Sequence, residues 1–225
     1  MTRVLQQIAL VSGKDLRIEA RSRQTLGLVV VLGVLIVVVL GLGLGPQQVA
    51  SGMAATAVLW VAYLFGGVLC FEKTMAVERH DGALAGLMLA PIDRGVIYVG
   101  KLISNLALMV ALALVVTPVA VVMFHFDLSA APLGFAAIMA GGFIGFAAIG
   151  TLFAAAVSSS KLQGGLLAMV VFPVSLPLVI TSTQMMMRLF GEGEPLGMTG
   201  VSVLVAFDAI YLVVSWLVFE LILEP

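Results

Sequence analysis

The sequence predicts an all-α membrane protein, a single transmembrane domain over residues 1–225, with six transmembrane helices, an N-terminal interfacial amphipathic helix and a long cytoplasmic loop. The first observation is the composition, which is 62% hydrophobic and only 10% charged, with a mean hydropathy of +1.21. A soluble domain usually carries about 25% charged residues. So few charges cannot cover a surface in water, but they suffice for a surface that faces lipid.

The second observation is a series of apolar runs of membrane-crossing length. Each is near the roughly 20 residues that span a hydrocarbon core about 30 Å thick. In lipid such a run must be helical, because every backbone N–H needs a partner within the segment. The six runs lie at about 26–44, 52–71, 102–124, 133–157, 164–187 and 201–223. The start of the sixth is open, since 201–206 could instead form a short external or re-entrant helix.

The third observation is the distribution of basic residues, which sets the orientation. With the N-terminus inside, ten of the eleven basic residues lie on the cytoplasmic side and one, Arg188, lies outside. The ten are Arg3, Lys14, Arg17, Arg21, Arg23, Lys73, Arg79, Arg94, Lys101 and Lys161. This positive-inside asymmetry predicts a multi-pass protein with both termini cytoplasmic.

Residues 1–25 have the pattern of a basic amphipathic helix. At 100° per residue one side is apolar and most of the cations lie on the opposite arc. The apolar side is formed by Val4, Ile8, Val11 and Ile18, with Leu5 and Leu16 beside them. Such a helix suits the membrane interface, with its cations toward anionic headgroups. Asp15 and Glu19 fall within the apolar arc; Glu19 is predicted to pair with Arg23, and Asp15 is a candidate contact for a partner protein.

Residues 95–101 match G-x-x-x-x-G-K, the signature of a phosphate-binding loop. The match is interpreted as accidental. Four consecutive bulky residues stiffen the segment, and Leu102 stands where a Ser or Thr would hold magnesium. We therefore expect no ATPase activity in this chain, and expect Lys101, at the start of a span, to reach toward the headgroups.

The second and third spans are connected by a predicted cytoplasmic loop over residues 72–101, which we call the coupling loop. It is unusually long for a connection, and such loops are commonly functional. Between charged flanks it carries an apolar patch, residues 83–90. An apolar patch on the cytoplasmic side indicates contact with a partner protein or with the membrane surface.

Four segments together carry a family resemblance. They are KDLRIEARSR before the first span, FEKT at the end of the second, ER-x-DGAL-x-GL-x-LAP-x-x-R in the loop, and Y-x-GK at the start of the third. The loop resembles that of ABC-2-type permeases. The full set resembles the CcmB family, whose members are permeases of the haem exporter used in cytochrome c maturation. The motifs are concentrated between Lys14 and Lys101, while topology and length match over the whole chain.

The resemblance implies a non-catalytic permease subunit that couples ATP hydrolysis by a partner to haem export, or to release of a haem-loaded chaperone. The implied partners are an ABC ATPase subunit, a second copy of the chain, a tryptophan-rich haem-handling membrane subunit, a small membrane subunit and a periplasmic haem chaperone. ATP would bind to the partner, and haem would be handled as cargo. The implied ATPase-coupling residues are Glu72, Lys73, Glu78, Arg79, Asp81, Leu84, Leu87, Met88 and Pro91.

Other functions remain open at this point. An ABC-2-type permease for another substrate, such as a lipid or drug, would have a similar loop. A secondary transporter would need buried charges or interrupted helices near the midplane. A purely structural assembly subunit is the fourth possibility. We expect no nucleic-acid partner, and the single cysteine, Cys70, excludes a multi-cysteine metal site.

Three features inside or beside the spans are further candidates. Asp208 is an ionisable residue in the sixth run, so it is either a functional intramembrane residue or an interfacial cap. Pro173 and Pro177 lie four apart in the fifth run and predict a kink or hinge. His125, at the outer end of the third run, is a possible haem contact, since histidine is the commonest axial ligand.

Overall fold

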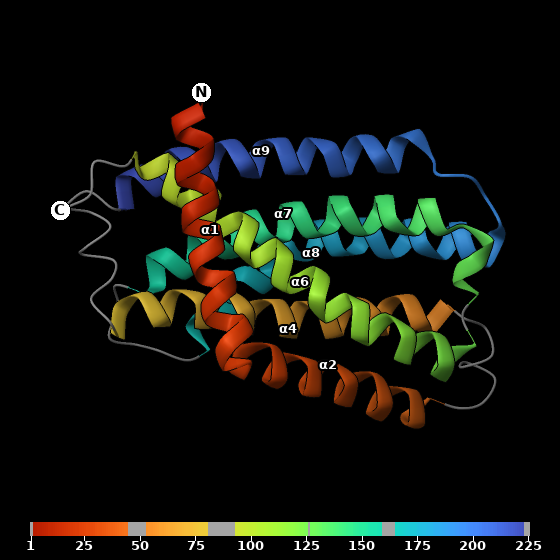
Figure 1. Ribbon diagram of the computed structural model, residues 1–225. Helices are drawn as coiled ribbons and strands as arrows, with labels where there is room; N and C mark the ends of the chain where they lie inside the picture. The colour runs from red at the N-terminus through yellow and green to blue at the C-terminus, as the bar shows by residue number, and fades with distance from the viewer. Residues whose placement is uncertain (1, 45–52, 81–92, 126, 159–164, 223–225) are drawn as a thin grey trace.

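The computed structural model describes residues 2–44, 53–80, 93–125, 127–158 and 165–222. Six of its helices are long and apolar enough to cross a membrane, which confirms the predicted all-α class and the number of spans. They run side by side, and the chain passes up and down between the two ends of the bundle (Figure 1). The helices are α1 (Thr2–Ser22), α2 (Gln24–Gly43), α4 (Met53–His80), α6 (Arg94–Phe124), α7 (Pro132–Ser158), α8 (Leu166–Met187) and α9 (Met198–Ile222).

The core of the bundle lies between α4 and α7, the two most buried spans, while α2 and α9 are mostly exposed. Aromatic rings join α4 to α7 at two levels. Phe71 and Phe146 pack edge to face with ring centroids 5.1 Å apart, and Tyr63 meets Phe143 at 5.2 Å. Lipid is as apolar as a side chain, so close packing, rather than exclusion of water, holds these helices together.

Helix α1 crosses the spans instead of running with them (Figure 1). It passes over the beginning of α6 and turns into α2 at Arg23, whose backbone is left-handed with φ 52°. The start of α6, the ends of α4, α7 and α9, and the start of α2 all lie toward this end of the bundle (Figure 1). This is the end that the charge asymmetry predicts to be cytoplasmic.

The predicted coupling loop over 72–101 is wrong at both ends. Helix α4 continues to His80, and α6 begins at Arg94. Hydropathy marks where the membrane ends, but a helix ends where its backbone bonds end. The residues after Phe71 include good helix formers with no Gly or Pro, and Asp93 caps α6 by accepting a hydrogen bond from Gly95 N at 3.1 Å.

The open question about the sixth span is answered by α8 and α9. A π-helical turn, Arg188–Glu192, continues α8, and Gly193 (φ 66°) ends it. Helix α9 then begins at Met198, so residues 201–206 belong to it and form no separate helix. Helix α8 passes through Pro173 and Pro177 without a break, and the predicted hinge there stays a prediction.

Candidate functional site

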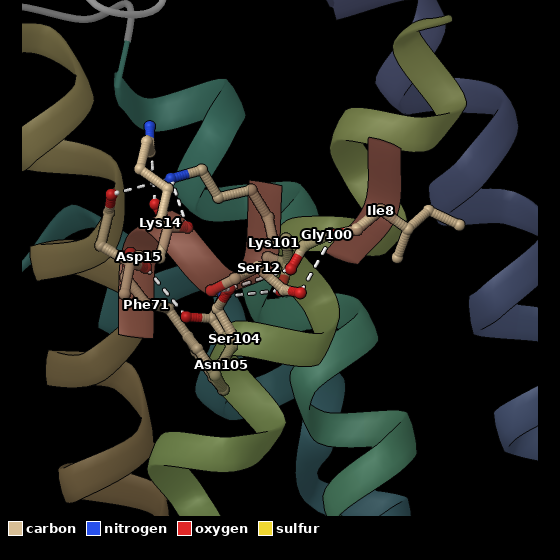
Figure 2. Close-up of polar contacts among 11 residues, drawn as sticks. Ile8, Ser12, Lys14, Asp15, Phe71, Gly100, Lys101, Ser104 and Asn105 are labelled. Carbon is tan, nitrogen blue, oxygen red and sulfur yellow. Dashed lines mark hydrogen bonds and ion pairs between the residues drawn. The ribbon is translucent and has the colours of Figure 1, made fainter. Parts of the chain in front are cut away.

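The contact between α1 and α6 is built around a buried ion pair. Asp15 of α1 and Lys101 of α6 approach to 2.8 Å between Oδ2 and Nζ, with side chains only 9% and 1% exposed (Figure 2). The sequence interpretation of both residues is therefore wrong. Asp15 contacts the chain's own α6, and Lys101 points into the protein and does not reach the headgroups. In this low-dielectric setting the buried ammonium group of Lys101 needs the carboxylate, because an unpaired buried charge is costly. The other carboxylate oxygen of Asp15 lies 3.6 Å from Nζ of the adjacent Lys14.

Close backbone approach brings the two helices together at this point. A Cβ placed on Gly100 would lie 2.7 Å from the Val11 side chain, so only glycine lets α1 lie this near to α6. One turn further along α6, the Ser104 hydroxyl is buried; it donates to Gly100 O at 2.9 Å and approaches Ser12 O of α1 at 3.5 Å (Figure 2).

Polar contacts continue from the ion pair into α4 and α7. Lys101 Nζ lies 3.5 Å from the backbone oxygen of Thr74 in α4. The Thr74 hydroxyl donates to Asn105 Oδ1 at 2.9 Å, and Asn105 Nδ2 donates to Thr151 Oγ1 of α7 at 2.8 Å. We call these five residues, Asp15, Thr74, Lys101, Asn105 and Thr151, the junction network. It links four helices; Lys101, Asn105 and Thr151 are buried, and Thr74 is half-buried.

The link from α1 to α2 is a second specific contact. Glu19, 8% exposed, accepts a hydrogen bond from Leu26 N at 2.7 Å, and so satisfies a free N–H in the first turn of α2. Its negative charge also lies at the positive end of that helix dipole. The predicted pair of Glu19 with Arg23 is replaced by this cap; Arg23 contributes its backbone N–H, which donates to Glu19 O at 2.7 Å.

The contacts of Asp15 and Glu19 explain why two acidic residues lie within the apolar arc of α1. They share the side of the helix that carries Val11 and Ser12, and that side faces the bundle. The other side is exposed and forms a shallow hollow of about 650 Å³, lined by Ala9, Leu10, Gly13, Lys14, Arg17, Ile18, Ala20 and Arg21. Its basic residues agree with the predicted contact with anionic headgroups.

The G-x-x-x-x-G-K match lies on the first turns of α6. A phosphate loop needs N–H groups that converge on an anion, whereas these residues direct theirs along a helix. Lys101, the residue that would contact phosphate, is in the ion pair with Asp15. The backbone and the lysine therefore both disagree with a phosphate-binding loop.

Only part of the predicted coupling set lies in the described structure. Glu72, half-buried, and Lys73, exposed, lie on α4 within a turn of Thr74. Glu78 and Arg79 are on the last turn of α4, and their side chains are outside the described part. Asp81, Leu84, Leu87, Met88 and Pro91 lie outside the described residues altogether.

Asp208 lies inside α9 and not at its beginning, so it does not cap the helix; a functional role within the membrane stays a prediction. Its carboxylate lies against α7, where a Cβ on Gly145 would come within 2.5 Å of Oδ1. That oxygen is buried and has no hydrogen-bond partner among the described residues. A small cavity of about 70 Å³ beside it is otherwise lined by apolar side chains and Gly141. Gly141 and Gly145 of α7 therefore pack against α9 within the chain, and Gly145 also lies against Leu178 of α8.

His125 is exposed at the other end of the bundle. It ends α6 in a left-handed conformation (φ 51°), and its N–H donates to Val121 O. Next to it, the Ser129 hydroxyl donates to Asp127 Oδ1 at 2.6 Å, which lowers the pKa of that carboxyl below its usual value. Among the described residues there is no cluster of three or more His, Cys, Asp or Glu that could hold a metal ion. Whether His125 contacts haem is not tested by this geometry.

Sequence reasoning missed the junction network. The sequence did contain a signal, because two residues of opposite charge lie where apolar residues are expected. Asp15 lies in the apolar arc of one helix, and Lys101 lies at the start of an apolar run. Each would be costly to bury alone, and each is acceptable if the two meet.

Comparisons with known proteins agree with this architecture. The family model described as "CcmB protein" matches residues 6–223. A protein of Paracoccus denitrificans (strain Pd 1222) named Heme exporter protein B is 27% identical over 187 residues, covering 81% of this chain and 84% of the relative. A protein of the same name from Rhodobacter capsulatus is 26% identical over 175 residues, covering 78% and 80%. This multi-pass membrane protein therefore belongs to the CcmB protein family.

Proposed function

We propose that this chain is the non-catalytic permease subunit of an ABC transporter complex that exports haem for cytochrome c maturation. The observation that carries the proposal is the family match over residues 6–223, supported by two relatives named Heme exporter protein B. Six spanning helices fit a permease. On this proposal the chain lies in the bacterial inner membrane with both termini cytoplasmic, as its basic residues favour.

The ATPase subunit is proposed to dock on the segment between α4 and α6. Helix α4 ends and helix α6 begins at the end of the bundle where α1 lies (Figure 1). Its apolar residues Leu84, Leu87 and Met88 are proposed to supply the contact, and charged residues precede them in the sequence. Burying one such side chain is worth roughly 1.5–3 kcal/mol, so a single charge can disrupt the docking.

ATP is proposed to bind only to that partner. The helical backbone of residues 95–101 and the engagement of Lys101 by Asp15 support this division of labour. Haem is cargo, delivered with a tryptophan-rich membrane subunit and a small membrane subunit to a periplasmic chaperone. His125, exposed at the outer end of α6, is the histidine of this chain that we propose for any direct contact with haem.

The test replaces Leu87 by Asp and follows assembly and function together. Leu87→Asp should leave the permease in the membrane but abolish co-purification of the ATPase and the yield of mature cytochrome c. Leu133→Asp is the matched control, because Leu133 is 86% exposed at the start of α7, at the opposite end of the bundle. A Leu87→Asp chain that keeps the ATPase and the cytochrome yield contradicts the docking site.

The cytochrome readout also separates this proposal from an ABC-2 permease for another substrate. In a strain that lacks the chain, wild-type protein supplied in trans should restore covalent haem attachment to c-type cytochromes. An intact ATPase complex with no effect on haem attachment would favour a different cargo.

A further inference from the structure

We propose that the Asp15–Lys101 ion pair is a positioning contact that transmits ATPase-driven movement from the docking segment to α1 and, through Glu19, to the span α2. The inference rests on the proposed function and deepens it. It assigns to two residues a role in coupling, and makes α1 the element that moves.

The location of the pair carries the first step. Helix α4 leads into the docking segment and α6 leads out of it. Both helices reach the same ammonium group, because Lys101 belongs to α6 and its Nζ lies 3.5 Å from the Thr74 carbonyl of α4. The same group binds Asp15 at 2.8 Å. A displacement of either helix end therefore acts on α1 at one point (Figure 2).

The second step is that the ion pair fixes the position of α1 relative to α6. Apolar packing tolerates sliding, whereas a buried ion pair holds two atoms at one distance. Replacing a buried pair by apolar residues is often neutral for stability, so a pair at this position specifies geometry more than it adds stability. The Gly100–Val11 approach keeps the two helix axes close around it, and Ser104 adds a polar contact one turn away.

The third step connects α1 to a membrane span. Glu19 caps α2 through Leu26 N at 2.7 Å, one turn of α1 beyond Asp15. A shift of α1 along its own axis therefore moves the first turn of α2. Helix α2 packs on both α4 and α6, so these three spans are linked through α1 as well as directly.

The experiment uses the complete complex and measures a coupling ratio, the mature cytochrome c formed per ATP hydrolysed. The variants are Asp15→Asn and the exchange Asp15→Lys with Lys101→Asp. Glu194→Gln is the control, an acid-to-amide change at an exposed site at the far end of the bundle. A merely structural role would lower the amount of complex, and with it both activities, but would leave their ratio unchanged.

Asp15→Asn should retain the ATPase subunit and its hydrolysis within about twofold, while the coupling ratio falls by at least about fivefold, as expected when a coupling contact is lost. The exchange variant should recover at least about half of the wild-type ratio, because the pair is rebuilt with its charges reversed. If Asp15→Asn does not accumulate, Asp15→Asn with Lys101→Met replaces it, since that pair leaves no buried charge alone.

A neutralised complex that assembles and keeps the wild-type ratio overturns the inference. So does an exchange variant that assembles but stays uncoupled. Failure of the proposed function is recognised separately and earlier, because a wild-type chain that co-purifies with no ATPase rules out the complex before any variant is made.

Discussion

Asn105 is predicted to stabilise the bundle through two interhelical hydrogen bonds. It is fully buried, accepts from Thr74 Oγ1 of α4 at 2.9 Å and donates to Thr151 Oγ1 of α7 at 2.8 Å. Asn105→Leu keeps the side-chain volume similar and removes both bonds. Interhelical hydrogen bonds in membrane proteins average about 0.6 kcal/mol and reach about 1.7 kcal/mol, so two of them set a range of about 1–3 kcal/mol.

The structure places the expected loss in the lower half of that range, at about 1–2 kcal/mol. The Thr74 hydroxyl has another acceptor, the Phe71 carbonyl at 3.1 Å, and so is not left without a partner. Thr151 can turn to a carbonyl of its own helix, as threonines in helices often do. A cycle that combines Asn105→Leu with Thr151→Val isolates one bond and should give a coupling energy of about 0.6–1 kcal/mol.

The assay is equilibrium unfolding in mixed micelles with increasing denaturing detergent, followed by the fluorescence of Trp60, which is 1% exposed in the core. Ser202→Ala is the control, since the Ser202 hydroxyl bonds only within α9, to Thr199 O at 2.9 Å. Additive single effects in the cycle, with no coupling energy, would refute the bond between Asn105 and Thr151. An Asn105→Leu chain as stable as wild type would refute the reasoning for both bonds.

Three further predictions concern topology, packing and nucleotide binding. Reporters fused after the C-terminus and within 81–92 should read cytoplasmic and a reporter at Gly193 periplasmic, and a periplasmic C-terminus would contradict the orientation. Gly145→Leu should lower the free energy of unfolding by about 1–3 kcal/mol, because the new side chain overpacks α7 against Asp208. Gly27→Leu is the control and should be neutral, because the space around a Cβ at Gly27 is open. Equal effects of the two variants would contradict the packing. The isolated chain should not be labelled by a photoreactive ATP analogue, and specific labelling would contradict the helical interpretation of residues 95–101.

The elements that could be predicted from the sequence are those set by local composition. Six apolar runs give six spans, because any such run in lipid must be helical. The bounds of α4 and α6 could not be placed by hydropathy, since both helices continue beyond the apolar run into charged sequence. The capping residue Asp93 was the available signal for the start of α6.

The candidate site was harder to predict because its contacts join distant parts of the chain. Asp15 and Lys101 belong to helices separated by two spans, and no local pattern says which buried acid meets which buried base. The same holds for Asp208, where the position inside a helix depends on where α9 begins. Likewise, only the fold shows that Gly141 and Gly145 of α7 pack against α9.

The ion pair has a consequence for how the chain is made. Helix α1 is synthesised first, yet the lysine that neutralises Asp15 arrives only with α6, after α2 and α4 have emerged. Until then the acid must remain hydrated at the membrane surface, so α1 can settle on the bundle only late in synthesis. A fragment that ends before α6 would lack Lys101, and Asp15 would keep only the partly exposed contact with the adjacent Lys14, which is 3.6 Å long in the complete chain.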